Sequence, residues 1–456
     1  MSPIATHDLM TQFLKWPLAG RPSRPKPKMM RLKLGLGLAL TPLLLGLFSC
    51  GSPRTIRDEN TVEFWTMQLQ PTFNPYFNDL IAEFEQEYPD QQVRWIDIPW
   101  AAMEARIVTS VSAQTAPDLV NLNPRFSALL AGRNAWLDLD EYISEEVRSQ
   151  YLDAIWDASR FDGTSFGIPW YLTTRITIYN QEIFQAAGID SPPQTFEELA
   201  QVAQQVREET GKYAFFVSFA PNDSGEVLES LVQMGVQLLN DDGTAAFNSP
   251  EGVAAFNYWR ELYQEGWLPR EVLTQGHQRA IELYQGGELA LVKTGPQFFQ
   301  TIATNAPDIA AVSQPAPQIT GDTGKIAVAV MNLLIPRDTV NPEGAIAFAL
   351  FLTNPENQLA FSQVANTLPS TRDTLDHDYF QEGGDEATPM DAARVISADQ
   401  LRRAEILVPP RSNVNELQAI LYDNLQATLL GEKTVEEALA DAEEEWNALL
   451  PSPTLP

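Results

Sequence analysis

One short segment of the chain has the residue types of a catalytic motif. Residues 163–167 read Gly-Thr-Ser-Phe-Gly, which matches the G-x-S-x-G pattern around a nucleophilic serine. That motif requires a strand, a sharp turn and then a helix, whereas residues 168–179 indicate extended chain. Only His277 and His377 follow as possible bases. The context therefore argues against a serine hydrolase.

The composition gives little support to metal or cofactor chemistry. The chain after residue 49 contains one cysteine and two histidines, whereas a tight zinc or copper site draws mainly on such ligands. We therefore expect no metal and no cofactor. Spacing does not exclude a pair of glycosidase carboxylates among the 59 Asp and Glu residues of this part, although nothing marks one. A secreted carbohydrate-active hydrolase stays open as an alternative.

The cysteine, Cys50, directly follows a short apolar segment, residues 34–48, which is preceded by basic residues. A basic region, an apolar region and a final Leu-Phe-Ser-Cys resemble a bacterial lipoprotein signal, whose cysteine is lipidated and becomes the first mature residue. The apolar segment is shorter than the ~20 residues that span a bilayer as a helix. We expect residues 1–49 to be a signal peptide, of which 1–28 could precede the real translation start.

The charge of the remaining chain restricts its partners. After residue 49 there are 23 basic and 59 acidic residues, a formal net charge of −36. Such a surface repels nucleic acid and anionic lipid headgroups. A single cysteine also excludes an internal disulfide. We expect an extracytoplasmic monomer, periplasmic or at the cell surface, held to the membrane only by lipid at Cys50, with no nucleic-acid partner.

The elements that must position any site alternate between strands and helices. Period-2 and period-3.6 patterns predict strands over 61–65, 93–96, 118–122, 213–219, 289–293 and 325–335. They predict helices over 77–88, 101–113, 195–210, 250–266, 343–352 and, with a stop at Gly431, 414–450. This alternation favours an α/β fold with mainly parallel sheets and right-handed crossovers.

Ten short segments occur in an order that is typical of one family: 62–66, 84–89, 116–120, 162–163, 167–170, 179–180, 187–189, 192–199, 247–251 and 286–291. The chain resembles the family 1 extracellular solute-binding proteins of ABC importers, which include maltodextrin- and glycerol-phosphate-type binding proteins. The resemblance covers about residues 61–372 and weakens beyond. It implies a two-lobed periplasmic-binding-protein fold, with hinge strands joining the lobes and a sugar-like ligand in the cleft between them. The strand over 327–333 lacks the Gly-Gly that often precedes it in the family.

The resemblance also implies the domain boundaries. A tether over 50–60 precedes an N-lobe formed by 61–168 plus about 312–337. The C-lobe then comprises about 169–311 plus 338–456.

Polar residues follow two strands of the predicted N-lobe sheet. Asn121, Asn123 and Arg125 lie at the carboxyl end of the strand over 118–122, and Gln68 leaves the first strand at the same edge. Open α/β sheets bind ligands at this edge, and planar amides and guanidinium groups suit paired sugar hydroxyls. Alternatively, Asn123 and Arg125 only turn the chain and cap the next helix.

The resemblance adds four further residues to the expected ligand site. It places Trp170 and Tyr171 beside the cleft, although a core pair at the hinge is the alternative. It places Gln297 where the family often has an aromatic residue, so that a hydrogen bond would replace stacking. Arg372 matches a late cleft turn and could clamp hydroxyls or a phosphate, or could instead pair with a surface carboxylate.

Together these features predict the solute-binding component of an ABC importer, without catalysis. Its partners would be a small carbohydrate or polyol and the transmembrane permease subunits. Few cleft cations favour a neutral sugar, although Arg125 and Arg372 leave a phosphorylated polyol open. Besides the hydrolase, a sugar-sensing subunit of a membrane receptor remains an alternative, because it would share fold and ligand.

Overall fold

The computed structural model describes residues 58–450, apart from residues 162, 222, 224, 322, 384–386, 409–410 and 412. The expected signal peptide, the lipidation site Cys50 and most of the tether lie outside the described residues. Arg57–Pro456 forms a compact unit by itself, and the fold given below is that of this unit. Among the described residues, no helix has both the length and the apolar character needed to cross a bilayer.

The first lobe is built on one mixed sheet with the strand order β11-β6-β10-β3-β1-β2. Its three N-terminal strands run parallel, as expected, whereas β10 runs antiparallel to both β3 and β6. The strands are β1 (Thr61–Met67), β2 (Gln92–Ile98), β3 (Leu119–Leu122), β6 (Gly167–Thr174), β10 (Ile326–Leu334) and β11 (Leu368–Pro369). A hairpin of β4 (Arg160–Phe161) and β5 (Thr164–Ser165) stands apart from this sheet.

Most helices of the first lobe bury apolar side chains. In the helix after β1, Phe77, Leu80 and Phe84 recur at three- and four-residue spacing and are buried together with β1 side chains. The helices are α1 (Asn74–Glu87), α2 (Trp100–Ser112), α3 (Pro124–Ala131), α4 (Glu145–Arg148), α5 (Asp153–Asp157), α13 (Pro342–Leu352), α14 (Pro355–Ala365) and α15 (Arg372–Leu375).

The second lobe contains a three-stranded sheet in the order β8-β7-β9, with antiparallel pairs. Its strands are β7 (Ile176–Asn180), β8 (Leu291–Thr294) and β9 (Ser313–Ala316). The segment predicted as a strand over 213–219 instead makes a single parallel bridge, from Tyr213 to Leu289. The expected parallel pairing is therefore present among β1, β2 and β3 of the first sheet, whereas the strands of the second sheet pair antiparallel.

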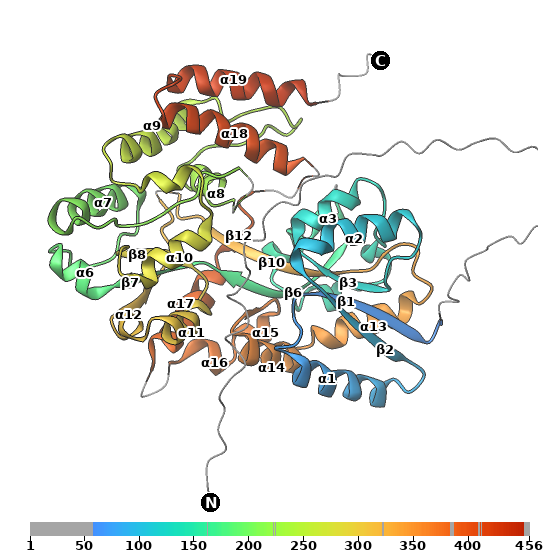
Figure 1. The fold of residues 1–456 in the computed structure, drawn as a ribbon. Coiled ribbons are helices and arrows are strands. Elements are labelled where there is room, and N and C mark those ends of the chain that lie inside the picture. The colour runs from blue at the N-terminus through green and yellow to red at the C-terminus, as the bar shows by residue number, and fades with distance from the viewer. Residues whose placement is uncertain are drawn as a thin grey trace, which may run out of the picture. The chain divides into compact units, whose positions relative to one another are not determined.

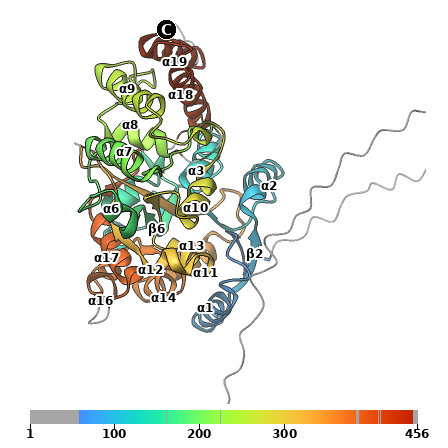
Figure 2. The ribbon, with the colours of Figure 1, turned by 60° about the vertical axis from the view of Figure 1, so that its left-hand side comes forward.

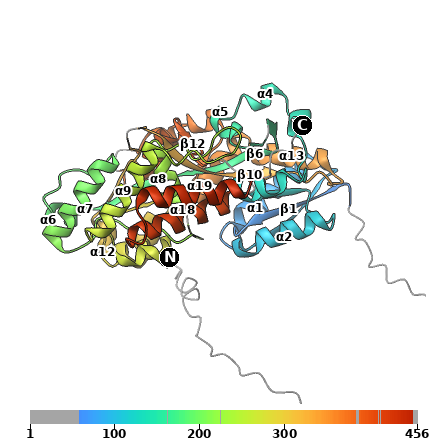
Figure 3. The same cartoon turned by 90° about the horizontal axis from the view of Figure 1, so that it is seen from above.

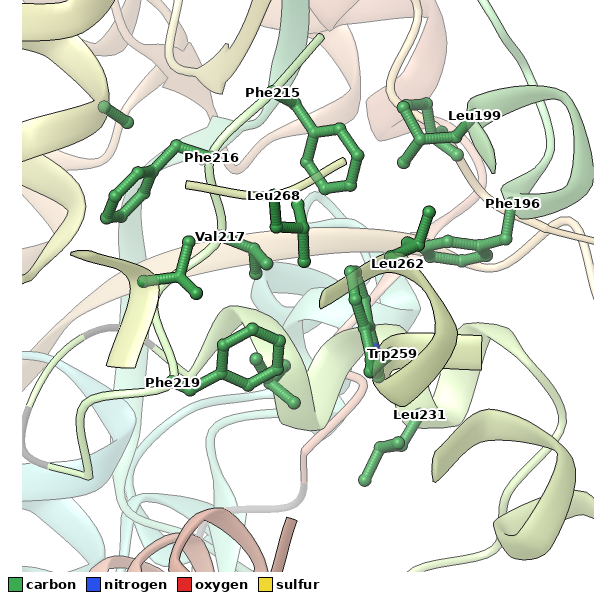
Figure 4. Packing of buried hydrophobic residues seen from close by; sticks show 14 of the residues in the cluster. Phe196, Leu199, Phe215, Phe216, Val217, Phe219, Leu231, Trp259, Leu262 and Leu268 are labelled. Atoms are coloured by element: carbon green, nitrogen blue, oxygen red, sulfur yellow. The ribbon is translucent and has the colours of Figure 1, made fainter. Parts of the chain in front are cut away.

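The helices of the second lobe surround its largest apolar cluster. Figure 4 shows Phe215, Phe219 and Trp259 converging in this core. The helices are α6 (Gln181–Ala186), α7 (Phe196–Thr210), α8 (Glu226–Gln233), α9 (Pro250–Gln264), α10 (His277–Gln285), α11 (Phe298–Asn305), α12 (Pro307–Ala311), α18 (Val414–Leu429) and α19 (Val435–Ala448). The helix predicted over 195–210 is α7, and it begins with a capping box in which Thr195 and Glu198 bond reciprocally.

The last two helices, α18 and α19, complete the second lobe. They lie side by side and next to α9, as Figures 2 and 3 show from two directions. Trp446 of α19 is fully buried and donates its indole N–H to the carbonyl of Gly243, 2.9 Å away. The predicted glycine stop between the two helices is present, since Gly431 adopts a positive φ of 74°.

Three chain connections cross between the two sheets. β6 ends at Thr174 and β7 begins at Ile176, so Arg175 is a one-residue link. The chain returns from β9 to β10, which runs beside β6 through the middle of Figure 1. It crosses a third time after α15, through α16 (Asp378–Gln381), α17 (Pro389–Leu401) and β12 (Ala404–Glu405).

These connections shift the expected lobe boundaries. β6 belongs to the first sheet up to Thr174, although residues from 169 were expected in the second lobe. β9 pairs with β7 in the second sheet, although 312–337 was expected in the first lobe. Residues 342–365 were expected in the second lobe, yet Phe348 and Phe361 share a core cluster with β1 and α1. An amphipathic pattern predicts the buried face of a helix but not the sheet that covers it.

Candidate functional site

The serine motif does not form a nucleophile site. Ser165 lies in the β4–β5 hairpin, is fully buried, and its Oγ accepts a hydrogen bond from the indole N–H of Trp156 at 3.1 Å. Gly163 forms the turn with a φ of 83°, and β6 rather than a helix follows. The strand–turn–helix geometry that exposes a nucleophile is therefore absent from this segment.

At the carboxyl edge of the first sheet, the loop after β1 is held rigidly. The carboxylate of Asp97 accepts hydrogen bonds from the hydroxyl of Thr66 at 2.7 Å and from the backbone N–H groups of Leu69 and Gln70 at 2.8 and 3.1 Å. Gln68 adopts a left-handed φ of 56°, its N–H donates to the carbonyl of Ile98, and its side chain is exposed. The fold thus presents Gln68 to solvent at this edge.

The same edge carries an aromatic residue that the sequence analysis missed. Trp100 follows β2 directly, begins α2, and is 42% exposed, which is unusual for so large an apolar side chain. Its ring lies 6.5 Å from that of Phe126, and the guanidinium of Arg125 lies 6.0 Å from the Phe126 ring. We call Gln68, Trp100, Asn123 and Arg125 the first-lobe edge.

Asn123 caps the helix that follows β3. Its side-chain oxygen accepts a hydrogen bond from the N–H of Phe126 at 2.9 Å, so the alternative reading as a helix cap is present in the structure. Asn123 remains partly exposed, and Arg125 is exposed. Asn121, in contrast, is fully buried, and its amide donates to the carbonyl of Asn332 at 3.3 Å.

The structure brings Asn121 and Tyr171 together. The Tyr171 hydroxyl donates to the side-chain oxygen of Asn121 at 3.4 Å, and the Tyr171 side chain is only partly exposed. Burial, followed by the charge of Asp97, raises the pKa of the Tyr171 hydroxyl. This hydroxyl therefore stays protonated and can act as a hydrogen-bond donor at neutral pH.

Trp170 occupies the core of the first lobe. It is 1% exposed, and its ring stacks on Phe361 at a centroid distance of 5.1 Å and an angle of 19°. Its indole N–H is buried and has no hydrogen-bond partner among the described residues. The core alternative, and not the cleft position, matches the burial of Trp170. This residue lies at a register shift between β6 and β10, and both its ring and that of Tyr171 pack on Phe361.

Two ion pairs, one buried and one partly exposed, lie where the chain enters the second lobe. Arg175 pairs with Glu229 of α8, and Lys293 of β8 lies 3.3 Å from Glu226 of the same helix. Antiparallel pairing of β7 with β8 places Ile176 opposite Thr294 and so keeps the two cations at neighbouring strand positions. We call Arg175, Glu226, Glu229, Lys293 and His277 the junction cluster.

The charges of the junction cluster compensate one another. Burial would raise the pKa of the Glu226 carboxyl, but the positive charges of Lys293 and Arg175 outweigh it and lower this pKa. Burial opposes the charge of Arg175, yet Glu229 and Glu226 raise its pKa above the ordinary value. Burial lowers the pKa of the His277 imidazole. The backbone N–H of His277 donates a hydrogen bond to the carboxylate of Asp223 at 2.9 Å. At neutral pH the cluster therefore has two matched ion pairs beside a neutral imidazole.

The last two expected site residues have different surroundings. Gln297 is exposed at the start of α11, shortly after β8, the strand that carries Lys293 of the junction cluster. Arg372 begins α15 and its guanidinium lies 2.6 Å from the carboxylate of Asp153, in an exposed pair. The surface-carboxylate alternative is therefore the contact that Arg372 makes.

A hydrolytic dyad finds no support in these carboxylates. A glycosidase needs one carboxyl group with a raised pKa, whereas the pKa of Glu226 is lowered. The pKa of Asp423 is raised, by burial and then by Glu445, but Asp423 lies on α18, outside the junction cluster. Among the described residues, no group of three or more His, Cys, Asp or Glu side chains could hold a metal ion.

A cavity of about 660 Å³ lies elsewhere, within the second lobe. Leu238, Lys325, Arg411 and Trp446 contribute to its wall. It includes no residue of the first-lobe edge, so a ligand in it would not touch both lobes. We therefore place the candidate site at the first-lobe edge and the junction cluster.

The strand β6 connects these two regions directly. Tyr171 contacts the end of β3, and Arg175 follows four residues later along extended chain, which is a span of about 13 Å at ~3.3 Å per residue. One region offers an exposed indole and amides, and the other offers fixed charges. Two α/β lobes with crossing strands and such a polar and aromatic edge define the class of periplasmic solute-binding proteins.

Comparisons with known proteins give the family. Residues 70–359 match the family model described as "Bacterial extracellular solute-binding protein", and the chain belongs to this family. The fold agrees with that of a Synechococcus sp. MITs9220 protein, described as a candidate oligosaccharide periplasmic-binding protein, with a TM-score of 0.79. The two are 42% identical, over 85% of this chain and 98% of the other.

Two further relatives are more distant. A mannitol-binding protein of Pseudomonas aeruginosa is 22% identical over 79% of this chain and 87% of its own length. A lipoprotein of Streptomyces antibioticus without an assigned activity is 25% identical over 76% of this chain and 78% of its own. The chain is thus similar to proteins that bind solutes for transport.

Proposed function

We propose that the chain is the lipid-anchored solute-binding component of an ABC importer for a sugar or polyol. The ligand would lie between the first-lobe edge and the junction cluster, and lobe closure around it would present the complex to the permease. A ligand that contacts both lobes binds the closed state better and therefore shifts the population toward it. The relatives' oligosaccharide and mannitol ligands support this class of solute.

One observation carries this proposal: β6 lies in the first sheet, where the Tyr171 hydroxyl bonds Asn121 of β3, and leads directly to Arg175 of the junction cluster. The cations Arg175, Lys293 and Arg372 each have a carboxylate partner. At these three positions a neutral ligand is favoured over a phosphorylated one, because a phosphate would have to compete with the carboxylates. Gln68, Asn123, Arg125, Tyr171 and Gln297 remain the proposed hydrogen-bonding residues, with Trp100 as the stacking surface.

A thermal-shift screen of the chain carrying Cys50→Ser tests the proposal. The panel contains neutral mono- and oligosaccharides, mannitol and other polyols, glycerol phosphates and, as controls, amino acids. A ligand at 100 times its Kd stabilises the folded state by about 2.7 kcal/mol, which a melting curve resolves. A shift with a neutral sugar or polyol is expected. No shift with any carbohydrate, or hydrolysis of a glycoside, would contradict the proposal.

Lipid anchoring is tested separately. In a bacterial host, the wild-type chain should fractionate with membranes, and mass spectrometry should find an acylated N-terminal peptide that begins at Cys50. The Cys50→Ser chain should lack the acyl group. An unmodified Cys50 in the membrane-bound wild type would contradict the anchor without affecting the sugar-binding proposal.

A further inference from the structure

Three buried glutamines meet where the chain crosses between the lobes. Gln233 comes from the last turn of α8, Gln318 from the segment between β9 and β10, and Gln400 from α17. Their exposures are 1%, 4% and 2%, respectively. Buried amides are costly unless their donors and acceptors are paired, so their contacts are informative.

Gln318 bonds both strands that enter the first sheet. Its side-chain nitrogen donates to the carbonyls of Arg175 at 3.3 Å and Ala327 at 3.2 Å, and its oxygen accepts from the N–H of Ala327 at 3.1 Å. The same oxygen accepts from the amide of Gln233 at 3.1 Å. One side chain thus links the β6–β7 connection, β10 and α8.

Gln400, on α17 of the third connection, completes the hydrogen-bond network. Its oxygen accepts from the backbone N–H of Gln318 at 2.6 Å, and its nitrogen donates to the carbonyl of Arg175 at 3.1 Å and the hydroxyl of Thr174 at 3.4 Å. The carbonyl of Arg175 therefore accepts from two buried amides. All three crossing connections are joined within this network.

We propose that Gln318 and Gln400 are positioning residues that form the pivot between the lobes and hold Arg175 in place for ligand binding. This inference rests on the proposed function. A movement between lobes requires dihedral changes at a few connecting residues, and here the shortest connection is Arg175 alone. The side-chain amides of Gln318 and Gln400 both donate hydrogen bonds to the backbone carbonyl of Arg175. These bonds restrict the movement between the two lobes and fix the position of the Arg175 guanidinium in the junction cluster.

A pocket of about 350 Å³ flanks this pivot. Gln318, Gln400, Ile326, Asp399 and Arg403 contribute to its wall. Gln318 and Gln400 are nevertheless at most 4% exposed, so their hydrogen bonds are largely shielded from solvent.

The test compares Gln318→Met and Gln400→Met with the control Gln358→Met. Methionine keeps the length of the side chain and removes the amide. Gln358 is equally buried and bonds Thr353 and Ser370, but these contacts lie wholly within the first lobe. We expect both pivot variants to bind the best sugar of the thermal-shift panel about tenfold more weakly by calorimetry, the scale of a modest coupling between sites.

The control should lose thermal stability to a similar degree and keep the wild-type affinity. Gln318→Glu keeps the acceptor for Ala327 but loses the donor to the carbonyl of Arg175, so it should bind no more tightly than Gln318→Met. Pivot variants whose affinity equals that of Gln358→Met, or exceeds that of the wild type, would overturn the inference.

A second readout does not need a sugar. Cys50 is the only cysteine, so a Cys50→Ser chain with Ala82→Cys on α1 and Gln201→Cys on α7 carries two spin labels at exposed positions, one on each lobe. The distance distribution between the labels should broaden in the pivot variants and stay narrow in the control. Equal widths overturn the pivot. If the wild type binds no sugar, the proposed function fails and these widths alone decide the pivot.

Discussion

The first-lobe edge and the junction cluster differ in how they expose polar groups to a solute. The first-lobe edge displays an exposed indole, amides and Arg125 where strands end and helices begin, and hydrogen bonds to Asp97 hold the loop that carries Gln68. The junction cluster instead contains charges that neutralise each other, and its Glu226–Lys293 pair is buried. The first region can lose a side chain with little effect on folding, whereas the second cannot. Function and stability are therefore separable on one lobe and coupled on the other.

The largest expected effect comes from breaking the Glu226–Lys293 pair. Glu226→Gln and Lys293→Met each leave a buried charge without its partner, which typically costs about 3–5 kcal/mol of unfolding free energy. The double variant removes both charges and should recover most of this loss. Urea unfolding followed by circular dichroism measures all three.

An exposed ion pair provides the matched control. Lys325 and Glu405 lie 3.7 Å apart, and both side chains are more than 40% exposed. Glu405→Gln should therefore lower the free energy of unfolding by less than about 1 kcal/mol. If Glu226→Gln lowers the free energy of unfolding no more than Glu405→Gln does, the proposed difference between the buried and the exposed ion pair is wrong.

Trp100 is expected to have the next largest effect, on affinity and not on stability. Trp100→Ala removes the exposed indole of the first-lobe edge, and we expect about tenfold weaker sugar binding, or about 1.4 kcal/mol, in the range of aromatic stacking. Calorimetry measures the affinity and a melting curve the stability. Tyr142→Ala, at another exposed aromatic residue, should change neither. An equal loss of affinity in both variants would contradict a specific role of Trp100.

Local patterns predicted the elements well and the site only in part. The capping box of Thr195 and Glu198 is a short-range signal, and the structure contains it. The lobe to which Phe348 packs depends on a sheet that is distant in sequence, so its helix pattern could not predict it. Likewise, nothing local to Lys293 indicates that Glu226 lies beside it.

The two tryptophans Trp170 and Trp100 show the same limit. The resemblance drew attention to Trp170, but its ring packs on Phe361 in the core of the first lobe and is 1% exposed. Trp100 directly precedes the helix predicted over 101–113, and it gave no signal from sequence alone. An unusually exposed indole at the carboxyl end of a strand is visible only once the sheet is known.

His277 is expected to make the junction cluster sensitive to pH. Its pKa is lowered by burial and by the positive charges of Arg175 and Lys293, whereas Glu226 and Asp223 act to raise it. The folded state therefore holds the neutral imidazole, and stability is fully present above the ordinary pKa of about 6.5 and falls as the pH drops through the lowered value. Between pH 7 and pH 5 the melting temperature of His277→Gln should decline less than that of the wild type. His377→Gln, at the start of α16, should retain the wild-type slope.

The smallest expected effect is that of Arg372→Ala. The guanidinium already pairs with Asp153, and the two side chains are 43% and 83% exposed, so solvent screening leaves less than about 1 kcal/mol of stability to lose. Affinity for the best neutral sugar should stay within about twofold, because the pair lies outside both the first-lobe edge and the junction cluster. Calorimetry with that sugar and with glycerol phosphate separates the two possible roles. Loss of glycerol-phosphate binding in Arg372→Ala, with Asp153→Asn unaffected, would instead make Arg372 an anion contact and move the site toward α15.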